Sequence, residues 1–495
     1  MKRVVIENAT YVVTVDEHDT ILRDHTLTVD DGVITAIEPA TPEAAQSGPS
    51  MRPLAGPGGG SHALRGRASE RRRRGADGSR PHDGSGGAGS DSDVTTIDAT
   101  GKLVMPGLVN LHTHLPMTLL RGLAENVDLQ GFLERVWAAE GVLMDPETVE
   151  LGATLGALES LLGGCTTQLD MYFHHEATHR GAVAAGSRHV IGPVFFDGPG
   201  PDGLAWQERL DGLRAWPGIL AEIGGPDVPV AAMPHATYTC APEGLAEVVS
   251  ALRELLSTEG ARRGVLTTHV SENGAENADV LERYGTTPIG VLHAAGWLSP
   301  DLPLVLGHGV HLSEADQERI TEAGAAVAHC PGSNLKLASG ALHWEALWEN
   351  GIRLGIGTDG CSSSNDLDMW QAMRQAAMLA RLTSGRPDVA SADQVLRAAT
   401  IEGARALGLG DVIGSLEVGK RADVAVVDLD APHLTPVHDV AALLVFAAGR
   451  ADVTDVLVDG NPVVRERRST RVDTPALLAR ARERSADARK GAATT

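Results

Sequence analysis

Eight short apolar runs that end in polar residues recur between residues 108 and 408. In order they read LVNLHTH, TTQLDMYF, HVIGPVFFD, VPVAAMPHA, VLTTHVSE, LPLVLGHGV, AAVAHCPGS and RLGIGTDG. Longer segments with helical periodicity separate these runs, and such alternation is typical of repeated βα units and a parallel sheet. Eight units predict an α/β fold built on a (β/α)8 barrel of the TIM type, in which catalytic groups lie at the carboxyl ends of the strands.

The polar residues at the ends of these runs favour the closed barrel. A doubly wound open sheet is the alternative, but it gives no reason for histidines at so many strand ends. One intervening helix is also legible, because Asp145 can cap it, Pro146 suits its first position, and Gly163 and Gly164 can end it. The polar residues at the strand ends are His112, His114, Asp170, Asp197, His235, His269, His308 and Asp359.

Both ends of the chain carry a different pattern, in which short segments alternate apolar and polar residues between turn formers. Examples are VVIENA and YVVTVD near the start and VTDVLVDGNPVV near the end. We expect both ends to build one small β-sandwich domain. The expected boundaries are 1–49 with 94–107 and 409–470 for the sandwich, 108–408 for the barrel, and 471–495 for a C-terminal helix or tail.

Residues 50–93 differ from the rest of the chain. They hold glycine clusters, a run of arginines and few large apolar side chains, so we expect a disordered insertion. The arginines could bind an acidic partner, although a solvated loop without function is the simpler interpretation.

The charge and hydropathy of the chain restrict its partners. Asp and Glu number 65 against 42 Lys and Arg, for a formal net charge of -23. This excess disfavours nucleic acid and anionic membranes. The first residues lack a signal pattern, and no apolar run approaches the ~20 residues needed to span a bilayer. We expect a cytoplasmic enzyme with a small-molecule substrate, and a homo-oligomer is left open.

A metal site is predicted from four of the residues at strand ends. His112 and His114 lie two apart at the end of the first run, and in extended chain both imidazoles can therefore reach one ion. Alone this pair is a weak signal, because paired histidines also occur on surfaces. His269 and Asp359 add a third imidazole and a carboxylate at the ends of the fifth and eighth runs. This set suits zinc, with iron or manganese as alternatives, and leaves a position for water.

The fourth run bears on the number of ions. Barrels of this kind with two metals commonly bridge them by a carboxylated lysine on that strand, and VPVAAMPHATYTC contains no lysine. One divalent ion is therefore favoured. His235, at the end of this run, is expected to face the substrate, with a structural histidine as the alternative.

Three residues are candidates for the chemistry. A metal-bound water loses its proton near neutral pH and becomes the nucleophile. Asp359 could accept a proton as well as bind the ion. Glu272, three residues after His269, could pass a proton to a ring nitrogen or leaving group, although a glutamate at a helix start is the alternative. His308 could orient the water or stabilise charge at the reacting carbon.

Seven ordered motifs give the chain a family resemblance: VMPGLVNLHTHLPMTLLRG, DMYFHHE, PHATYTC, THVSEN, LGHGVHL, HCPGSNLKLASG and GTDGCSSSNDLDM. They resemble the amidohydrolase superfamily and, within it, the methylthioadenosine/S-adenosylhomocysteine deaminase and triazine hydrolase group. The resemblance implies a β-sandwich from both chain ends, a metal held by His112, His114, His269 and Asp359, and Glu272 as proton shuttle. It also implies substrate contacts from His235 and from an acid after the first helix. The residue that matches this acid is Glu140.

The third run departs from the family pattern. Relatives that act on adenosine thioethers carry an arginine at its end, where this chain has Pro193, Phe195 and Phe196. Arg209 could reach inward from the following helix, although a surface position is expected. The substrate could then lack a carboxylate.

The leading hypothesis is a hydrolase acting on C–N bonds that deaminates an amino-substituted heterocycle and releases ammonia. An adenosine-type nucleoside or another purine is the expected substrate. A triazine hydrolase that displaces chloride or an amine, or a pterin or guanine deaminase, is the alternative. A non-catalytic scaffold is disfavoured because none of the expected ligands is missing from the sequence.

Overall fold

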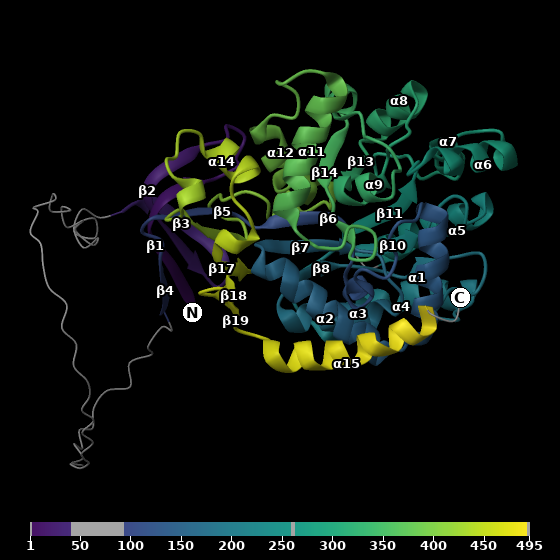
Figure 1. Ribbon diagram of the computed structural model, residues 1–495, viewed down its shortest axis with the longest axis horizontal. Helices are drawn as coiled ribbons and strands as arrows, with labels where there is room; N and C mark the ends of the chain where they lie inside the picture. Colours follow the sequence, from purple (N-terminus) through teal and green to yellow (C-terminus); the bar gives the residue numbers. More distant parts are fainter. Residues whose placement is uncertain (1, 41–93, 259–262, 493–495) are drawn as a thin grey trace, which may run out of the picture.

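The computed structural model describes residues 2–40, 94–258 and 263–492, with side chains to residue 486 (Figure 1). The insertion expected at 50–93 lies outside the described residues. Within the described ranges, no helix is both long and apolar enough to cross a membrane.

The central part of the chain forms the predicted barrel. Parallel strands run in the order β14-β13-β12-β11-β10-β9 in one sheet and β15-β6-β7-β8 in the other. The third and eighth expected strands are each split in two, and these split strands connect the two sheets along the chain. The strands are β6 (Leu108–His114), β7 (Cys165–Asp170), β8 (Arg188–Val190), β9 (Val194–Phe195), β10 (Val230–Pro234), β11 (Gly264–Val270), β12 (Leu304–His308), β13 (Ala326–His329), β14 (Arg353–Ile356) and β15 (Asp359–Gly360).

The break in the third strand has a local cause. Gly192 lies so close to β10 that a Cβ atom there would be 1.7 Å from the carbonyl oxygen of Ala231. Pro193 follows and has no N–H to donate to a neighbouring strand. β8 pairs with β7, and the ladder with β10 begins at β9, where Val194 pairs with Met233.

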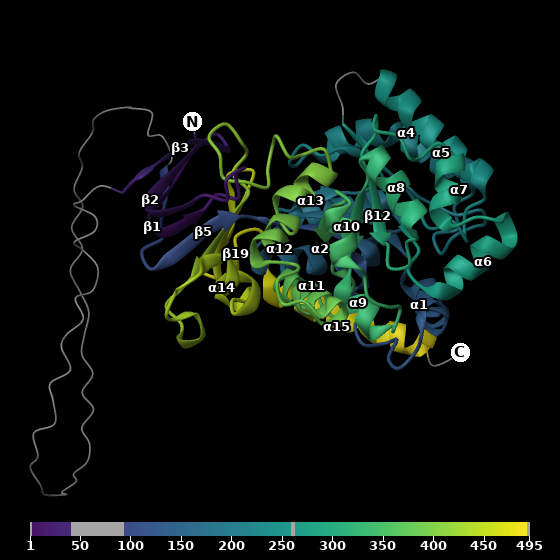
Figure 2. The same ribbon diagram turned by 90° about the horizontal axis from the view of Figure 1, so that it is seen from above.

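Helices surround the barrel (Figure 2). The predicted cap of α2 is confirmed, because the side chain of Asp145 accepts a hydrogen bond from the backbone N–H of Thr148 at 2.9 Å. The helices are α1 (Leu129–Leu143), α2 (Pro146–Leu162), α3 (His175–Ala185), α4 (Trp206–Ile223), α5 (Pro242–Thr258), α6 (Gly274–Tyr284), α7 (Pro288–Ala294), α8 (Glu314–Ala323), α9 (Pro331–Lys336), α10 (Trp344–Glu349), α11 (Met369–Ser384), α12 (Ala392–Ala398) and α13 (Ile401–Ala406).

Both ends of the chain contribute to a nine-stranded sheet beside the barrel. The two segments expected near the start form one strand, β1, because a bulge between Ile6 and Ala9 keeps both halves paired with β2. Apolar side chains from both chain ends, such as Ile6, Leu27 and Val424, share one buried cluster. The strands are β1 (Arg3–Val13), β2 (Ile21–Asp30), β3 (Val33–Pro39), β4 (Val94–Asp98), β5 (Lys102–Pro106), β16 (Val424–Asp428), β17 (Val453–Val458), β18 (Asn461–Arg465) and β19 (Arg468–Ser469).

Two features join the chain ends to the barrel. Helix α14 (Val440–Phe446) packs on α12, and the C-terminal helix α15 (Thr474–Ala492) runs along α1 and α2 (Figure 1). Arg188 of β8 donates two hydrogen bonds to the carboxylate of Asp423, at 2.9 and 3.0 Å, where both side chains are 1% exposed. This buried bidentate pair fixes the barrel against the sheet.

Candidate active site

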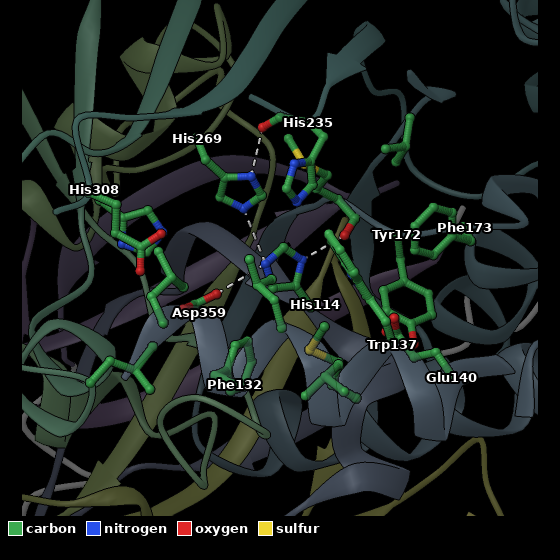
Figure 3. A pocket seen from close by; sticks show the side chains of 18 of the residues that line it. His114, Phe132, Trp137, Glu140, Tyr172, Phe173, His235, His269, His308 and Asp359 are labelled. Atoms are coloured by element: carbon green, nitrogen blue, oxygen red, sulfur yellow. Dashed lines mark hydrogen bonds and ion pairs between the residues drawn. The ribbon is translucent and has the colours of Figure 1, made fainter. Parts of the chain in front are cut away.

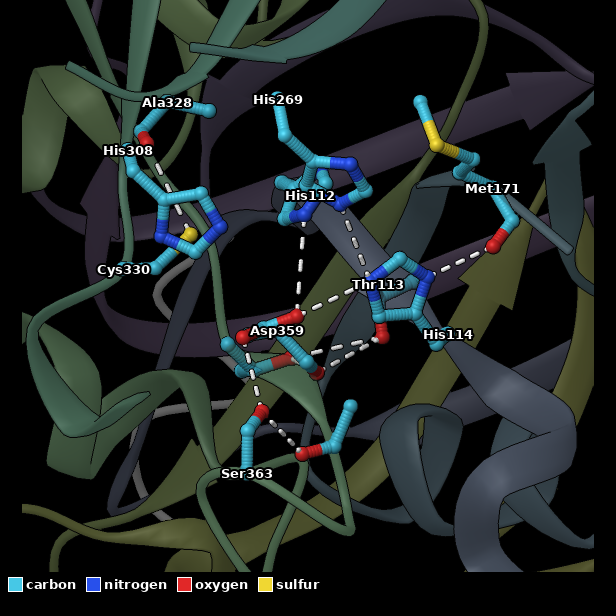
Figure 4. A network of polar contacts seen from close by, with 12 residues as sticks. His112, Thr113, His114, Met171, His269, His308, Ala328, Cys330, Asp359 and Ser363 are labelled. Carbon is cyan, nitrogen blue, oxygen red and sulfur yellow. Dashed lines mark hydrogen bonds and ion pairs between the residues drawn. The ribbon is translucent and has the colours of Figure 1, made fainter. Parts of the chain in front are cut away.

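Three histidines and an aspartate lie together at the carboxyl ends of the barrel strands (Figure 4). His112 and His114 come from β6, His269 from β11, and Asp359 from β15, which pairs with β6 beside Thr113. Nε2 of His114 lies 3.0 Å from Oδ1 of Asp359 and 3.4 Å from Nε2 of His269. Nitrogens of the three histidines lie within 4.8 Å of one another, and so do ligand atoms of His112, Asp359 and the nearby His308. The four predicted ligands are therefore adjacent in space.

The hydrogen bonds of these histidines suit a bound cation. Nδ1 of His114 donates to the carbonyl of Met171 at 2.6 Å, and Nδ1 of His269 donates to the carbonyl of His235 at 2.8 Å. These bonds leave the Nε2 lone pairs facing each other, as in metal-ligating histidines. Both ring nitrogens of His112 are buried with no hydrogen-bond partner among the described residues. Because such orphaned groups are costly, the donor set fits a divalent metal better than an empty cavity.

The charges of the cluster differ between its members. Burial would lower the pKa of His114, but its bond to Asp359 raises that pKa to about 9, so His114 must release a proton when it binds an ion. Burial lowers the pKa of His112 and of His269 well below the ordinary range, so both imidazoles are neutral. Burial alone would raise the pKa of Asp359, but its bond to His114 and the surrounding histidines hold that pKa well below its usual value. Oδ2 of Asp359 also accepts a hydrogen bond from the Ser363 hydroxyl at 2.7 Å. Neutral imidazoles and an ionised carboxylate are the protonation states that bind a metal.

Three residues at or just after the ends of the barrel strands have a strained backbone. Ser271, His308 and Asp359 have φ angles of +49°, +69° and +61°, which place these non-glycine residues in the left-handed region. Each such residue costs about 1–3 kcal/mol and persists only where the surrounding structure enforces it. Strain of this kind clusters at functional sites.

Glu272 lies on the rim of the metal-ligand cluster. Its side chain is 5% exposed, and Oε2 is 3.8 Å from Nε2 of His308, whose Nδ1 lies 3.0 Å from the amide oxygen of Asn334. Burial raises the pKa of Glu272. The alternative of a glutamate at a helix start does not describe it, because α6 is capped by Asn273 and its first-turn glutamate is Glu276.

Glu276 was not singled out in the sequence. Its two carboxylate oxygens accept the backbone N–H groups of Ser271 and Glu272, at 2.9 and 2.7 Å. The four-residue spacing to Glu272 was the available signal, but it is also common in ordinary helix starts. Asn334, which bonds His308, had no signal beyond its place in the HCPGSNLKLASG motif.

A cavity opens beside the cluster (Figure 3). Helix α1 lines it with apolar side chains such as Phe132 and Trp137, while His269 and Asp359 lie on the cluster side. Glu272 also lines the cavity. The cavity therefore combines an apolar wall with a polar, metal-binding end.

Glu140 faces this cavity from α1. It is 1% exposed, and its Oε1 accepts a hydrogen bond from the Tyr172 hydroxyl at 2.7 Å, which leaves the second oxygen without a protein partner among the described residues. Burial raises the pKa of Glu140 to about 7. Tyr172 was not identified in the sequence, although it lies two residues after Asp170 in the DMYF motif and should therefore share its strand face.

His235 also lines the cavity. Its Nδ1 lies 3.1 Å from the hydroxyl of Thr239, and the ring stacks on Phe196 at a centroid distance of 4.7 Å. Burial lowers its pKa to about 3, so the imidazole is neutral. The His235 ring therefore contacts Thr239 and Phe196, as a structural histidine would, and it also lines the cavity.

Three other residues, two from the expected strand ends and one from the helix after the third strand, are not part of the histidine–aspartate cluster. The expected surface position of Arg209 is wrong: the side chain is 2% exposed because it pairs with Asp202 and donates to the carbonyl of Val194 at 2.8 Å. Asp170 is fully buried and holds the start of the loop after β6, accepting the N–H of Leu115 at 3.2 Å. Asp197 accepts the N–H of Ala241, which follows β10.

Comparisons with known proteins agree with this geometry. A model described as the amidohydrolase family matches residues 103–463. The chain is 42% identical over 396 residues to a 5-methylthioadenosine/S-adenosylhomocysteine deaminase from Desulforudis audaxviator, which covers 79% of this chain and 88% of the relative. It is 38% identical over 398 residues to a 5′-deoxyadenosine deaminase from Methanosarcina mazei, with coverages of 79% and 88%.

Solved structures show the same relationship. An adenosine deaminase from Xanthomonas campestris with bound zinc superposes with a TM-score of 0.82 at 34% identity and covers 98% of both chains. The atrazine chlorohydrolase TrzN from Arthrobacter aurescens, complexed with zinc, shares the fold with a TM-score of 0.79 at 23% identity, over 97% of this chain and 100% of that one.

Proposed function

The chain belongs to the amidohydrolase family, and on that premise we propose that it is a hydrolytic deaminase of adenosine-type nucleosides that uses one divalent metal ion. The observation that carries the proposal is the joint placement of three groups around one cavity: the histidine–aspartate cluster, Glu272 on its rim, and Glu140 on α1. The relatives named as deaminases of 5-methylthioadenosine, S-adenosylhomocysteine and 5′-deoxyadenosine support this substrate class.

His112, His114, His269 and Asp359 are the proposed metal ligands. Zinc is the preferred ion because the adenosine deaminase of Xanthomonas campestris binds it and because imidazoles with a carboxylate suit it, although iron and manganese accept the same ligands. The fourth strand and the residue after it, Val230 to His235, contain no lysine that could bridge a second ion, which supports a single ion. When bound, such an ion acts as a Lewis acid and lowers the pKa of a water molecule toward neutrality.

The protein residues manage the protons of the reaction. Water replaces the amino group at the ring carbon, so the carbon gains an oxygen, ammonia leaves, and a proton must reach the ring nitrogen and the leaving group. Glu272 suits this transfer because burial raises its pKa and lets it hold a proton nearer to neutral pH. Asp359, which is ionised before the attack, can accept a proton from the attacking water and return it to the leaving ammonia. His308, 3.8 Å from Glu272 and held by Asn334, orients the reacting groups.

Glu140 and His235 are the proposed substrate contacts. Tyr172 occupies one oxygen of Glu140, and the other oxygen can accept hydrogen bonds from ribose hydroxyls. Because Glu140 lies on α1, opposite the cluster in Figure 3, a nucleoside can place its base at the metal end and its ribose at this carboxylate. His235, neutral and facing the cavity, can donate or accept a single hydrogen bond to the ring.

A substrate panel that separates ammonia from chloride release tests the proposal. The panel should contain adenosine, 5′-deoxyadenosine, guanine, a pterin and a chlorotriazine. We expect ammonia release with the highest kcat/KM for the adenosine-type nucleosides. Chloride release from the triazine without ammonia from any nucleoside would replace the proposal with a triazine hydrolase.

A further inference from the structure

The wall of the cavity that belongs to α1 is apolar. Leu129, Phe132, Leu133 and Trp137 line it, and Leu337 contributes from beyond α9. An apolar wall gives a carboxylate no hydrogen bond in exchange for the water that it must lose. A substituent that extends along this wall is therefore favoured when the atoms that contact the wall carry no charge.

Positive side chains do not compensate for this wall within the described part of the chain. Neither lysine nor arginine lines the cavity. Arg209, which follows the third strand, is committed to Asp202 and to the carbonyl of Val194. Turning it toward the cavity would leave Asp202 buried and unpaired, and breaking a buried pair costs about 3–5 kcal/mol. Arg209 is therefore not available to bind a substrate carboxylate.

A second hollow adjoins the cavity and shares Leu129, Leu133 and Tyr238 with it. We call it the outer hollow. Its charged lining residues are Asp128, Glu276, Asp279 and Arg283.

The charges of the outer hollow sum to a negative value. Arg283 is the only cation among its described lining residues, and it pairs with Asp279 at 2.8 Å. Asp128 is exposed and accepts the N–H of Gly131 at the start of α1. Even when Glu276 is protonated, two carboxylates face one guanidinium. A negatively charged group that leaves the cavity by this route is repelled.

We propose that the enzyme selects adenosine-type nucleosides whose 5′ substituent lacks a carboxylate, so that S-adenosylhomocysteine is a poor substrate beside thioethers of similar length without a carboxylate. This inference rests on the proposed deaminase function. With the base at the metal end and the ribose at Glu140, the 5′ substituent extends along the α1 wall toward the outer hollow. The apolar wall, the committed Arg209 and the acidic outer hollow then act together against a carboxylate.

A series of thioethers of matched length tests this selectivity. The probes are 5-methylthioadenosine, the propyl and 3-aminopropyl thioethers of 5′-thioadenosine, and S-adenosylhomocysteine, each followed by ammonia release. We expect kcat/KM for both propyl compounds to exceed that for S-adenosylhomocysteine at least tenfold. Because exposed charges are screened by salt, the ratio between the 3-aminopropyl thioether and S-adenosylhomocysteine should fall between 0.02 and 0.5 M ionic strength, as estimated from a Debye length of about 10 Å at 0.1 M.

A charge-removing variant tests the part played by the outer hollow. Asp279→Asn removes one carboxylate and frees Arg283 from its ion pair. The ratio of kcat/KM for S-adenosylhomocysteine to kcat/KM for the propyl thioether should therefore rise about threefold. Asp211→Asn is the matched control, because Asp211 is also an exposed helical aspartate paired with an arginine, Arg214 at 3.0 Å, but does not line either hollow. It should leave the ratio unchanged.

Three outcomes would overturn the inference. A kcat/KM for S-adenosylhomocysteine equal to or above that of the propyl thioether would contradict it while leaving nucleoside deamination intact. Discrimination that neither salt nor Asp279→Asn alters would contradict the role of charge. Failure to release ammonia from any nucleoside would instead overturn the proposed function, and the inference with it.

Discussion

The carboxylate of Glu276 accepts a hydrogen bond from the backbone N–H of Glu272, with Oε2 2.7 Å from the nitrogen. Its other oxygen accepts the N–H of Ser271, whose φ of +49° turns the chain away from β11. Glu276 therefore holds the turn that directs Glu272 into the cavity. It acts through Glu272 and is a positioning residue.

Replacing Glu276 by glutamine should slow the chemical step. A glutamine has one acceptor oxygen, so one buried N–H of the turn loses its partner, at a cost of about 1–3 kcal/mol. We expect Glu276→Gln to lower kcat at least tenfold with little change in KM or metal content. Glu282→Gln, an exposed glutamate on the same helix, is the control. A change in KM alone, or none at all, would show that Glu276 does not position Glu272.

Glu272→Gln should slow turnover strongly and retain the metal. Glutamine keeps the shape but cannot carry a proton between the ring nitrogen and the leaving group, and general acid–base catalysis contributes about 10²–10⁴-fold. We expect kcat to fall by that order, with metal content equal to that of the wild type by elemental analysis. Full turnover in the metal-loaded variant would exclude Glu272 as the proton shuttle.

The raised pKa of Glu140 predicts a pH dependence of stability. Burial raises this pKa from an ordinary 4.5 to about 7, so between these values the folded protein keeps a proton that the unfolded chain has released. The free energy of unfolding should therefore fall as the pH rises through this window, by at most ~1.4 kcal/mol per pH unit for one proton. Glu140→Gln should make this slope smaller by the contribution of one proton when Tm is measured from pH 4.5 to 7.5 on metal-loaded protein, while Glu276, whose pKa is also raised to about 7, keeps its own contribution. Identical slopes in both proteins would contradict the assignment.

The pair of Arg188 and Asp423 should contribute strongly to stability. Arg188→Ala leaves Asp423 buried and unpaired, and we expect a loss of about 3–5 kcal/mol in the free energy of unfolding. Arg180→Ala is the control, because Arg180 is 44% exposed and its pairs with Glu150 and Glu176 should contribute only about 0–1 kcal/mol. If denaturant unfolding showed similar losses of unfolding free energy in both variants, the buried pair would contribute no more to stability than the exposed pairs.

The barrel and the ligand cluster could be predicted from the sequence because both depend on local periodicity. His112 and His114 lie two residues apart in one strand, so their side chains point to the same face. The barrel fold then brings the carboxyl ends of the other strands to the same rim. Helix α2 was predictable for a similar reason, since Asp145 and Gly163 signal its ends locally.

Contacts between distant segments could not be predicted in this way. Tyr172 lies two residues after the end of β7 and meets Glu140 of α1, and the sequence alone does not indicate that these two segments come together. Arg209 was expected at the surface because arginines usually lie there. Its partner Asp202 lies in a loop, whose conformation the sequence pattern did not indicate, and this pair keeps the guanidinium buried.

Zinc titration of metal-free protein, with ammonia release from adenosine as the readout, tests the central claim most directly. The metal-free protein should be inactive, and activity should rise linearly to a plateau at one ion per chain. Tm should rise over the same range, because an ion that binds only the folded state stabilises it. Full ammonia release without metal, or a plateau at two ions per chain, would contradict a deaminase that works with one ion at His112, His114, His269 and Asp359.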